Sequence, residues 1–253
     1  MGCVFCATGR LGLARNLTAG EIVDQVNLVE ASNGCGSRFV KRRTLDAAVT
    51  SRATDSRITN VVFMGMGEPL ANYEATLDAI RILNNPEGRH IGIRHLTLST
   101  CGLAEGIERL ANEDIQPRLA ISLNAPTDAI RRKLMPIAKK YSLVRLFSAV
   151  EFYQRKTRNR VTFEYCLMKG VNDTALHAKM LVKRLRGVIC NVNLIEYNPH
   201  EGCNLEPGGR QAVERFAEVL KGAGIETTIR LKMGRTINAA CGQLGAKRTE
   251  RPE

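Results

Sequence analysis

Short apolar runs alternate with helix-type segments along most of this 253-residue chain. The runs have the length of buried strands, and they predict strands at residues 60–64, 95–99, 118–122, 161–167, 191–195 and 227–230. Helices are predicted between them, at 73–83, 104–111, 128–134, 143–153, 172–186 and 210–221. Strands that alternate with helices form a parallel sheet with right-handed crossovers. We therefore expect an α/β fold with about six strand–helix steps, fewer than the eight of a full barrel.

One more helix is predicted near the N-terminus, where Thr18 and Glu21 have the spacing of a capping box. Its apolar face would contain Ile22, Val23, Val26 and Val29. Residues 33–57 are polar, basic and interrupted by glycine, which indicates a loop or an insertion. We expect residues 1–253 to form one domain without a signal peptide or a membrane span.

The charge balance points to an acidic partner. The net charge is +12, and basic residues recur in clusters such as Arg131, Arg132 and Lys133. Each cluster alone is most simply a solvated face, but the sum favours a polyanion, and nucleic acid is the usual one. Eight cysteines scattered through a long chain favour the reducing cytoplasm, with thiols kept for metal binding or catalysis.

Small or polar residues follow successive predicted strands. They are Gly67 and Glu68, then Ser99, then Ser122 with Asn124, and finally Asn198. In parallel α/β sheets the ligand lies beyond the carboxyl ends of the strands, so these residues predict one binding site. A glutamate beside glycine backbone can bind the ammonium and carboxylate groups of an amino acid by charge-assisted hydrogen bonds.

Two cysteines near the N-terminus, Cys3 and Cys6, are two residues apart. A zinc site would need a second such pair, and a thioredoxin-type redox pair would need a preceding strand, so spacing alone leaves their role open. Cys241 lies among small residues, either as a buried structural cysteine or at the same site. Gly65-x-Gly67 lacks the third glycine of a dinucleotide-binding loop. The four histidines lack metal-ligand spacing.

Taken together, several motifs in order resemble the RlmN/Cfr family of radical S-adenosylmethionine RNA methyltransferases. They are GCVFCATG at 2–9, RNLTAGEI at 15–22, VFMGMGEPL at 62–70, LSTCG at 98–102, AISLNAP at 120–126 and AACGQL at 239–244. The resemblance covers essentially the whole chain. It implies a partial (β/α)6-type radical SAM barrel that lacks its first strand.

The resemblance also implies the cofactors and their ligands. Family members hold a [4Fe–4S] cluster through three cysteines, and Cys3 and Cys6 match two of them. The open iron binds S-adenosylmethionine, whose other contacts correspond to Gly67, Glu68, Ser99, Ser122, Leu123, Asn124 and Asn198.

The implied chemistry is methylation of an sp² carbon of adenine. Cys241 matches the cysteine that carries the methyl group, and a radical formed on that methyl group adds to the base. The RlmN branch modifies C2 of an adenine in 23S rRNA and in some tRNAs, whereas the Cfr branch modifies C8 of the rRNA adenine. Such an enzyme is expected to be a cytoplasmic monomer that uses a low-potential electron donor.

The sequence departs from the family pattern at several points. The first cluster cysteine is expected two residues upstream of Met1. The resemblance places three further features upstream of it: the first strand, a second cysteine that resolves the protein–RNA crosslink, and an N-terminal RNA-binding domain. Cys35 is a poor substitute ligand, because a cluster needs preorganised ligands. Glu196 and Thr236 stand where proline and an acidic residue are usual. A truncated, clusterless RNA-binding remnant is therefore a third hypothesis for this chain.

Overall fold

The computed structural model describes residues 1–32, 57–200 and 202–230 of the chain. The predicted loop at 33–57 therefore lies almost wholly outside the described residues. The same holds for Cys35, Thr236 and Cys241.

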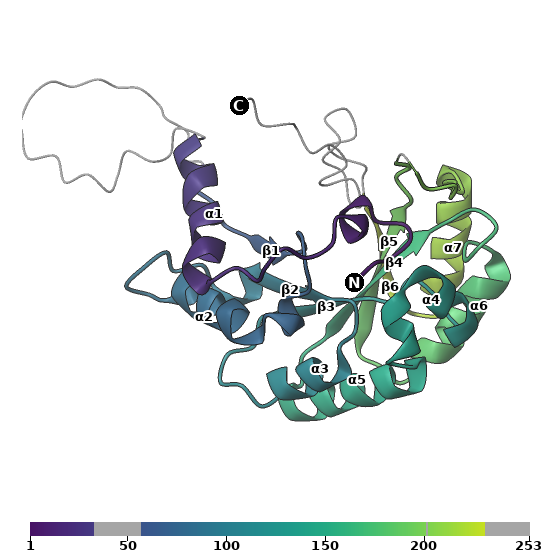
Figure 1. The fold of residues 1–253 in the computed structure, drawn as a ribbon. Helices are drawn as coiled ribbons and strands as arrows, with labels where there is room; N and C mark the ends of the chain where they lie inside the picture. Colours follow the sequence, from purple (N-terminus) through teal and green to yellow (C-terminus); the bar gives the residue numbers. More distant parts are fainter. Residues whose placement is uncertain (33–56, 201, 231–253) are drawn as a thin grey trace, which may run out of the picture.

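The described residues contain one sheet of six parallel strands in the order β1-β2-β3-β4-β5-β6 (Figure 1). The strands are β1 Val61–Phe63, β2 Leu96–Thr100, β3 Arg118–Ser122, β4 Val161–Leu167, β5 Cys190–Glu196 and β6 Glu226–Ile229. Each strand pairs with the next one along the chain, which requires a crossover after every strand. The predicted α/β class and the six steps are confirmed.

Helices form the connections and cover the outer side of the sheet (Figure 1). They are α1 Ala19–Ser32, α2 Tyr73–Asn84, α3 Ala104–Leu110, α4 Asp128–Leu134, α5 Leu143–Thr157, α6 Ala175–Leu185 and α7 Arg210–Gly222. Short 3-10 turns lie at Ala7–Arg10, Pro69–Ala71, Ile93–His95 and Pro136–Lys139. None of the helices described here is long and apolar enough to cross a membrane.

The two faces of β4 have different surroundings. Phe163 and Tyr165 point outward, where their rings lie 5.5 Å from the Phe147 ring of α5 and 5.1 Å from the Phe216 ring of α7. Side chains alternate along a strand, so Glu164 points to the opposite, inner side. The hydrophobic core thus lies between the sheet and its helices, and the inner face is left to polar residues.

Two sequence expectations about burial are wrong. Val29 of α1 is 51% exposed, because the second half of this helix extends past α2 (Figure 1). The strand at 60–64 is not buried: Val62 is 55% exposed, because β1 is an edge strand within the described sheet and pairs only with β2.

The capping box at the start of α1 is confirmed. The Thr18 amide donates to the Glu21 carboxylate at 2.9 Å, and the Glu21 amide donates to the Thr18 hydroxyl at 3.3 Å. Arg15 forms a two-pronged ion pair with the same carboxylate. These contacts, Arg15 first, lower the pKa of Glu21 from 4.5 to about 2.

This pKa predicts a specific acid sensitivity. Because the pKa is lowered in the folded state, Glu21 stabilises the fold above pH 4.5, and this contribution is lost as the pH falls towards about 2. Urea unfolding between these pH values should show a steeper loss of stability for the wild-type chain than for Glu21→Gln. The exposed Glu218→Gln is the matched control. Equal slopes for the wild type and Glu21→Gln would contradict the assignment.

Candidate functional site at the carboxyl ends of the strands

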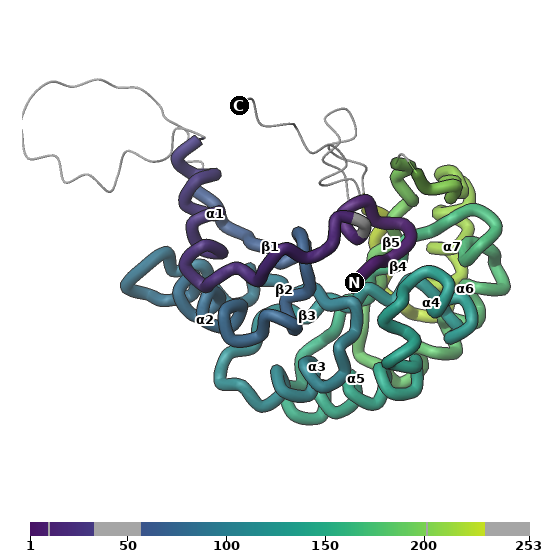
Figure 2. Tube along the Cα trace, viewed as in Figure 1, coloured from purple at the N-terminus to yellow at the C-terminus, as the bar shows by residue number. Residues whose placement is uncertain are grey.

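The N-terminal segment lies against the carboxyl ends of the strands (Figure 2). The Val4 amide donates to the Leu134 carbonyl at 3.0 Å, and the Val4 carbonyl accepts from the Cys203 thiol at 3.3 Å. Cys3 and Phe5 pack on a small cluster of buried residues that includes Cys101. The Cys3–Cys6 pair is therefore held at the edge where the sequence predicted a ligand site.

The loop that carries the two cysteines is compact. The Cys6 amide donates to the Cys3 carbonyl at 3.2 Å, and the Gly9 amide donates to the Cys6 carbonyl at 3.1 Å. A Cβ atom at position 9 would lie only 3.2 Å from the backbone of Cys3, which is tighter than most such contacts, so the loop favours glycine there. Burial, followed by the nearby Cys6 thiol, raises the pKa of Cys3 to about 11.

Glu68 joins the ends of β1 and β2. The residue is only 8% exposed, and its carboxylate accepts from the Leu70 amide at 3.1 Å and from the Cys101 amide at 2.8 Å. Gly67 precedes it with φ +94°, a conformation that side chains rarely adopt. Each carboxylate oxygen can accept a second hydrogen bond, so Glu68 retains acceptor capacity for a ligand.

Arg131 joins β2 to β3 and corrects a sequence expectation. The basic cluster at 131–133 was expected to be solvated, but the Arg131 side chain is fully buried. Its guanidinium donates to the carbonyls of Cys101 at 2.7 Å, Leu123 at 3.3 Å and Tyr141 at 3.4 Å. Desolvation lowers its pKa. The missed signal is helical spacing, because Arg131 lies on the same face of α4 as the buried Leu134.

The end of β3 is fixed by Asn124, which has a φ of +57°. Its side-chain oxygen accepts from the Cys166 amide at 2.9 Å, and its carbonyl accepts from the Asn172 side chain at 2.8 Å. Leu123 is buried, whereas Ser99 and Ser122 are half-buried on the inner face.

The structure thus brings the predicted strand-end residues to one edge. Asn198 is buried just after β5, at the same edge. Glu164 and Arg131 are two residues that the sequence reasoning missed there.

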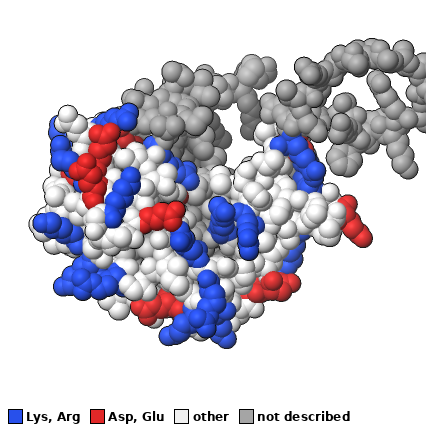
Figure 3. All heavy atoms as spheres, turned by 180° about the vertical axis from the view of Figure 1, so that it is seen from behind, with Lys and Arg blue, Asp and Glu red and all other residues white. Residues whose placement is uncertain are grey.

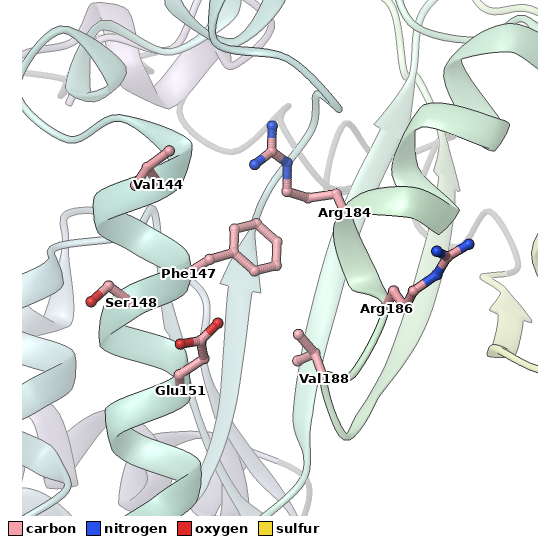
Figure 4. A pocket seen from close by; sticks show the side chains of 7 residues that line it. All are labelled: Val144, Phe147, Ser148, Glu151, Arg184, Arg186 and Val188. Atoms are coloured by element: carbon pink, nitrogen blue, oxygen red, sulfur yellow. The ribbon is translucent and has the colours of Figure 1, made fainter.

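A groove lies elsewhere, between α5 and α6 (Figure 4). Phe147 and Arg184 point toward each other across it, with the guanidinium 5.9 Å from the ring centroid. Phe147 packs on the outer face of the sheet, so this groove is separate from the strand-end site. The back of the molecule carries lysines and arginines interspersed with acidic residues (Figure 3).

Cys3 and Cys6 are suitable as two ligands of an iron–sulfur cluster, because cysteine thiolates on one tight loop are the usual ligands of such clusters. No group of three His, Cys, Asp or Glu residues that could hold a metal ion occurs in the part of the chain that the structure describes. The described residues therefore supply two ligands for a cluster, Cys3 and Cys6.

Comparisons with known proteins agree with this geometry. Residues 1–181 match the model of the Radical SAM superfamily. The chain is 46% identical over 246 residues to a Thermus thermophilus protein named "Probable dual-specificity RNA methyltransferase RlmN", and 45% identical to a Symbiobacterium thermophilum protein of the same name. These matches cover 97% and 96% of this chain but only 64% and 61% of the relatives, so the chain spans less than two thirds of their length.

Two solved structures are also similar to this chain. A radical SAM methyltransferase from Sphaerobacter thermophilus has a TM-score of 0.87 and 43% identity, covering 97% of this chain and 67% of that one. Streptococcus suis SuiB bound to S-adenosylmethionine has a TM-score of 0.57 at 12% identity, covering 95% of this chain and 53% of that one, and it shares the fold alone.

Proposed function

The chain belongs to the radical SAM superfamily and resembles its RlmN-type members, and on this premise we propose that it is the catalytic barrel of an RNA methyltransferase acting on C2 of adenine in 23S rRNA and in some tRNAs. The observation that carries the proposal is the Cys3–Cys6 loop, which is held against the same strand ends as Glu68, Ser99 and Asn124. The family uses a [4Fe–4S] cluster and S-adenosylmethionine.

Cys3 and Cys6 would be two cluster ligands. When bound, the reduced cluster supplies the electron that cleaves the sulfonium of S-adenosylmethionine. Gly67, Glu68, Ser99, Ser122, Leu123, Asn124 and Asn198 would bind S-adenosylmethionine itself.

Two features of the site support these roles. Glu68 is held rigidly by two amide donors, so its remaining lone pairs are preorganised for an ammonium group. Arg131 keeps the ends of β2 and β3 together, and with them Ser99 and Ser122.

Cys241, which lies outside the described residues, would carry the methyl group to the adenine. The net charge of +12 suits RNA in the cytoplasm as the substrate. A low-potential donor would supply electrons, and we expect the chain to act as a monomer.

Methyl transfer tests the proposal directly. The protein is expressed from its full-length reading frame, reconstituted anaerobically with iron and sulfide, reduced, and incubated with S-adenosylmethionine and unmodified 23S rRNA. Mass spectrometry of the digested RNA should find 2-methyladenosine with the wild-type chain and none with Cys241→Ala.

The other outcomes each contradict the proposal. 8-Methyladenosine would assign the Cfr-type reaction instead. An unmodified RNA together with an absent iron–sulfur absorbance would support a clusterless RNA-binding remnant.

A further inference from the structure

One buried carboxylate on the inner face of the sheet has an incomplete set of partners. Glu164 of β4 is 5% exposed. Its Oε1 atom accepts from the Asn193 side chain at 2.9 Å and from Arg230 at 3.4 Å. Its Oε2 atom is buried and has no hydrogen-bond partner in the residues that the structure describes. An unsatisfied buried carboxylate oxygen is costly, so it calls for a missing donor.

The sheet register locates this oxygen. Glu164 is directly opposite Ser122 of β3 on one side and Asn193 of β5 on the other. Both donors to Oε1 come from the β5 and β6 side, so the β3 side of the carboxylate supplies none of its described donors. Ser122 is half-buried, and its register with Glu164 places both residues on the inner side of the sheet. Neighbouring strands are about 5 Å apart, so the two groups can hold one ligand between them.

The chemistry of the pair selects the ligand. A carboxylate oxygen accepts hydrogen bonds, and a hydroxyl can donate or accept one. A pair of adjacent hydroxyl groups on a ribose ring satisfies both, and an acidic residue holds ribose hydroxyls in many nucleotide-binding sheets. Within RNA the 3′-oxygen is esterified, so a free nucleoside offers both hydroxyls and an internal RNA nucleotide does not. This favours the nucleoside half of S-adenosylmethionine over the RNA.

We propose that Glu164 is a further residue of the S-adenosylmethionine site, where its carboxylate accepts a hydrogen bond from a ribose hydroxyl beside Ser122. The proposal rests on the proposed function, because it uses the same ligand. The terminal torsion of glutamate is soft, so the carboxylate can turn toward the ligand while Asn193 and Arg230 hold its other oxygen.

Binding of S-adenosylhomocysteine to the full chain tests the proposal. Isothermal titration calorimetry compares the parent ligand with its 2′-deoxy and 3′-deoxy analogues on the wild type, on Glu164→Gln and on Glu151→Gln. Glu151 is an exposed glutamate on the outer helix α5, so its substitution makes the same chemical change away from the site.

We expect the loss of affinity caused by the deoxy analogue and the loss caused by Glu164→Gln to be non-additive. One deoxy analogue should bind the wild type about tenfold more weakly, as expected for a hydrogen bond to a charged group. Glu164→Gln should bind the parent ligand about tenfold more weakly as well, but should lose little more with that analogue. Glu151→Gln should bind like the wild type. The analogues on the wild-type chain need no variant to fold.

Four results would overturn the proposal. Additive losses, or equal affinity of folded Glu164→Gln and the wild type, would remove Glu164 from the ligand while leaving the proposed function standing. Weaker binding of an adenosine-containing RNA oligonucleotide with unchanged S-adenosylhomocysteine affinity would assign Glu164 to the RNA. No binding of S-adenosylhomocysteine to the wild type would instead remove the proposed function, and this inference with it.

Discussion

Replacing Arg131 by methionine should destabilise the chain by about 3 to 5 kcal/mol, because three buried carbonyl groups lose their donor. The carbonyl of Cys101 contributes most, since its 2.7 Å contact is the shortest of the three. Urea denaturation followed by circular dichroism measures the loss. The same variant should weaken S-adenosylhomocysteine binding, because the ends of β2 and β3 are no longer joined.

Arg132→Met is the matched control, since Arg132 is the exposed neighbour on the same helix. It should change stability by less than about 0.5 kcal/mol. Arg131→Lys should be intermediate, because an ammonium group cannot reproduce the fork geometry of guanidinium. Equal stability of Arg131→Met and Arg132→Met would contradict the claim that Arg131 joins the ends of β2 and β3.

Replacing Glu68 by alanine should cost about 2 to 4 kcal/mol, because the amides of Leu70 and Cys101 lose a charged acceptor. Glu68→Ala should lower the stability of the β1–β2 strand ends more than that of the rest of the fold. Hydrogen exchange of the Cys101 amide should accelerate strongly, whereas amides in the middle of β4 should keep their protection relative to global stability.

Glu74→Ala provides the comparison. Glu74 pairs with Arg109 at the surface and is 72% exposed, and such pairs contribute about 0 to 1 kcal/mol. If Glu68→Ala were no more costly than Glu74→Ala, Glu68 would not be the link between β1 and β2.

Much of the fold follows from sequence periodicity. The predicted ranges of β3, β4 and α4 agree with the structure, because each is a short patterned segment bounded by turn residues. Burial was harder to predict. Val62 belongs to an apolar run but lies on an edge strand, and strand position in a sheet depends on contacts distant in sequence.

The residues of the site could likewise be predicted only in part from the sequence. Gly67, Glu68, Ser99 and Asn124 could be found because parallel strands place their carboxyl ends at one edge. Arg131 was missed because two charged neighbours, Arg132 and Lys133, suggested a solvated face. Glu164 was missed although its alternation with Phe163 and Tyr165 marks it as facing inward, since charge in a strand is usually exposed.

The central claim is that S-adenosylmethionine binds at the carboxyl ends of the strands. Hydrogen–deuterium exchange of the full chain with and without S-adenosylhomocysteine tests it most directly. We predict protection of residues 67–71, 99–103 and 122–124, with no change in the groove between α5 and α6 in Figure 4. Protection of that groove around Phe147 and Arg184, with the strand ends unchanged, would contradict the claim.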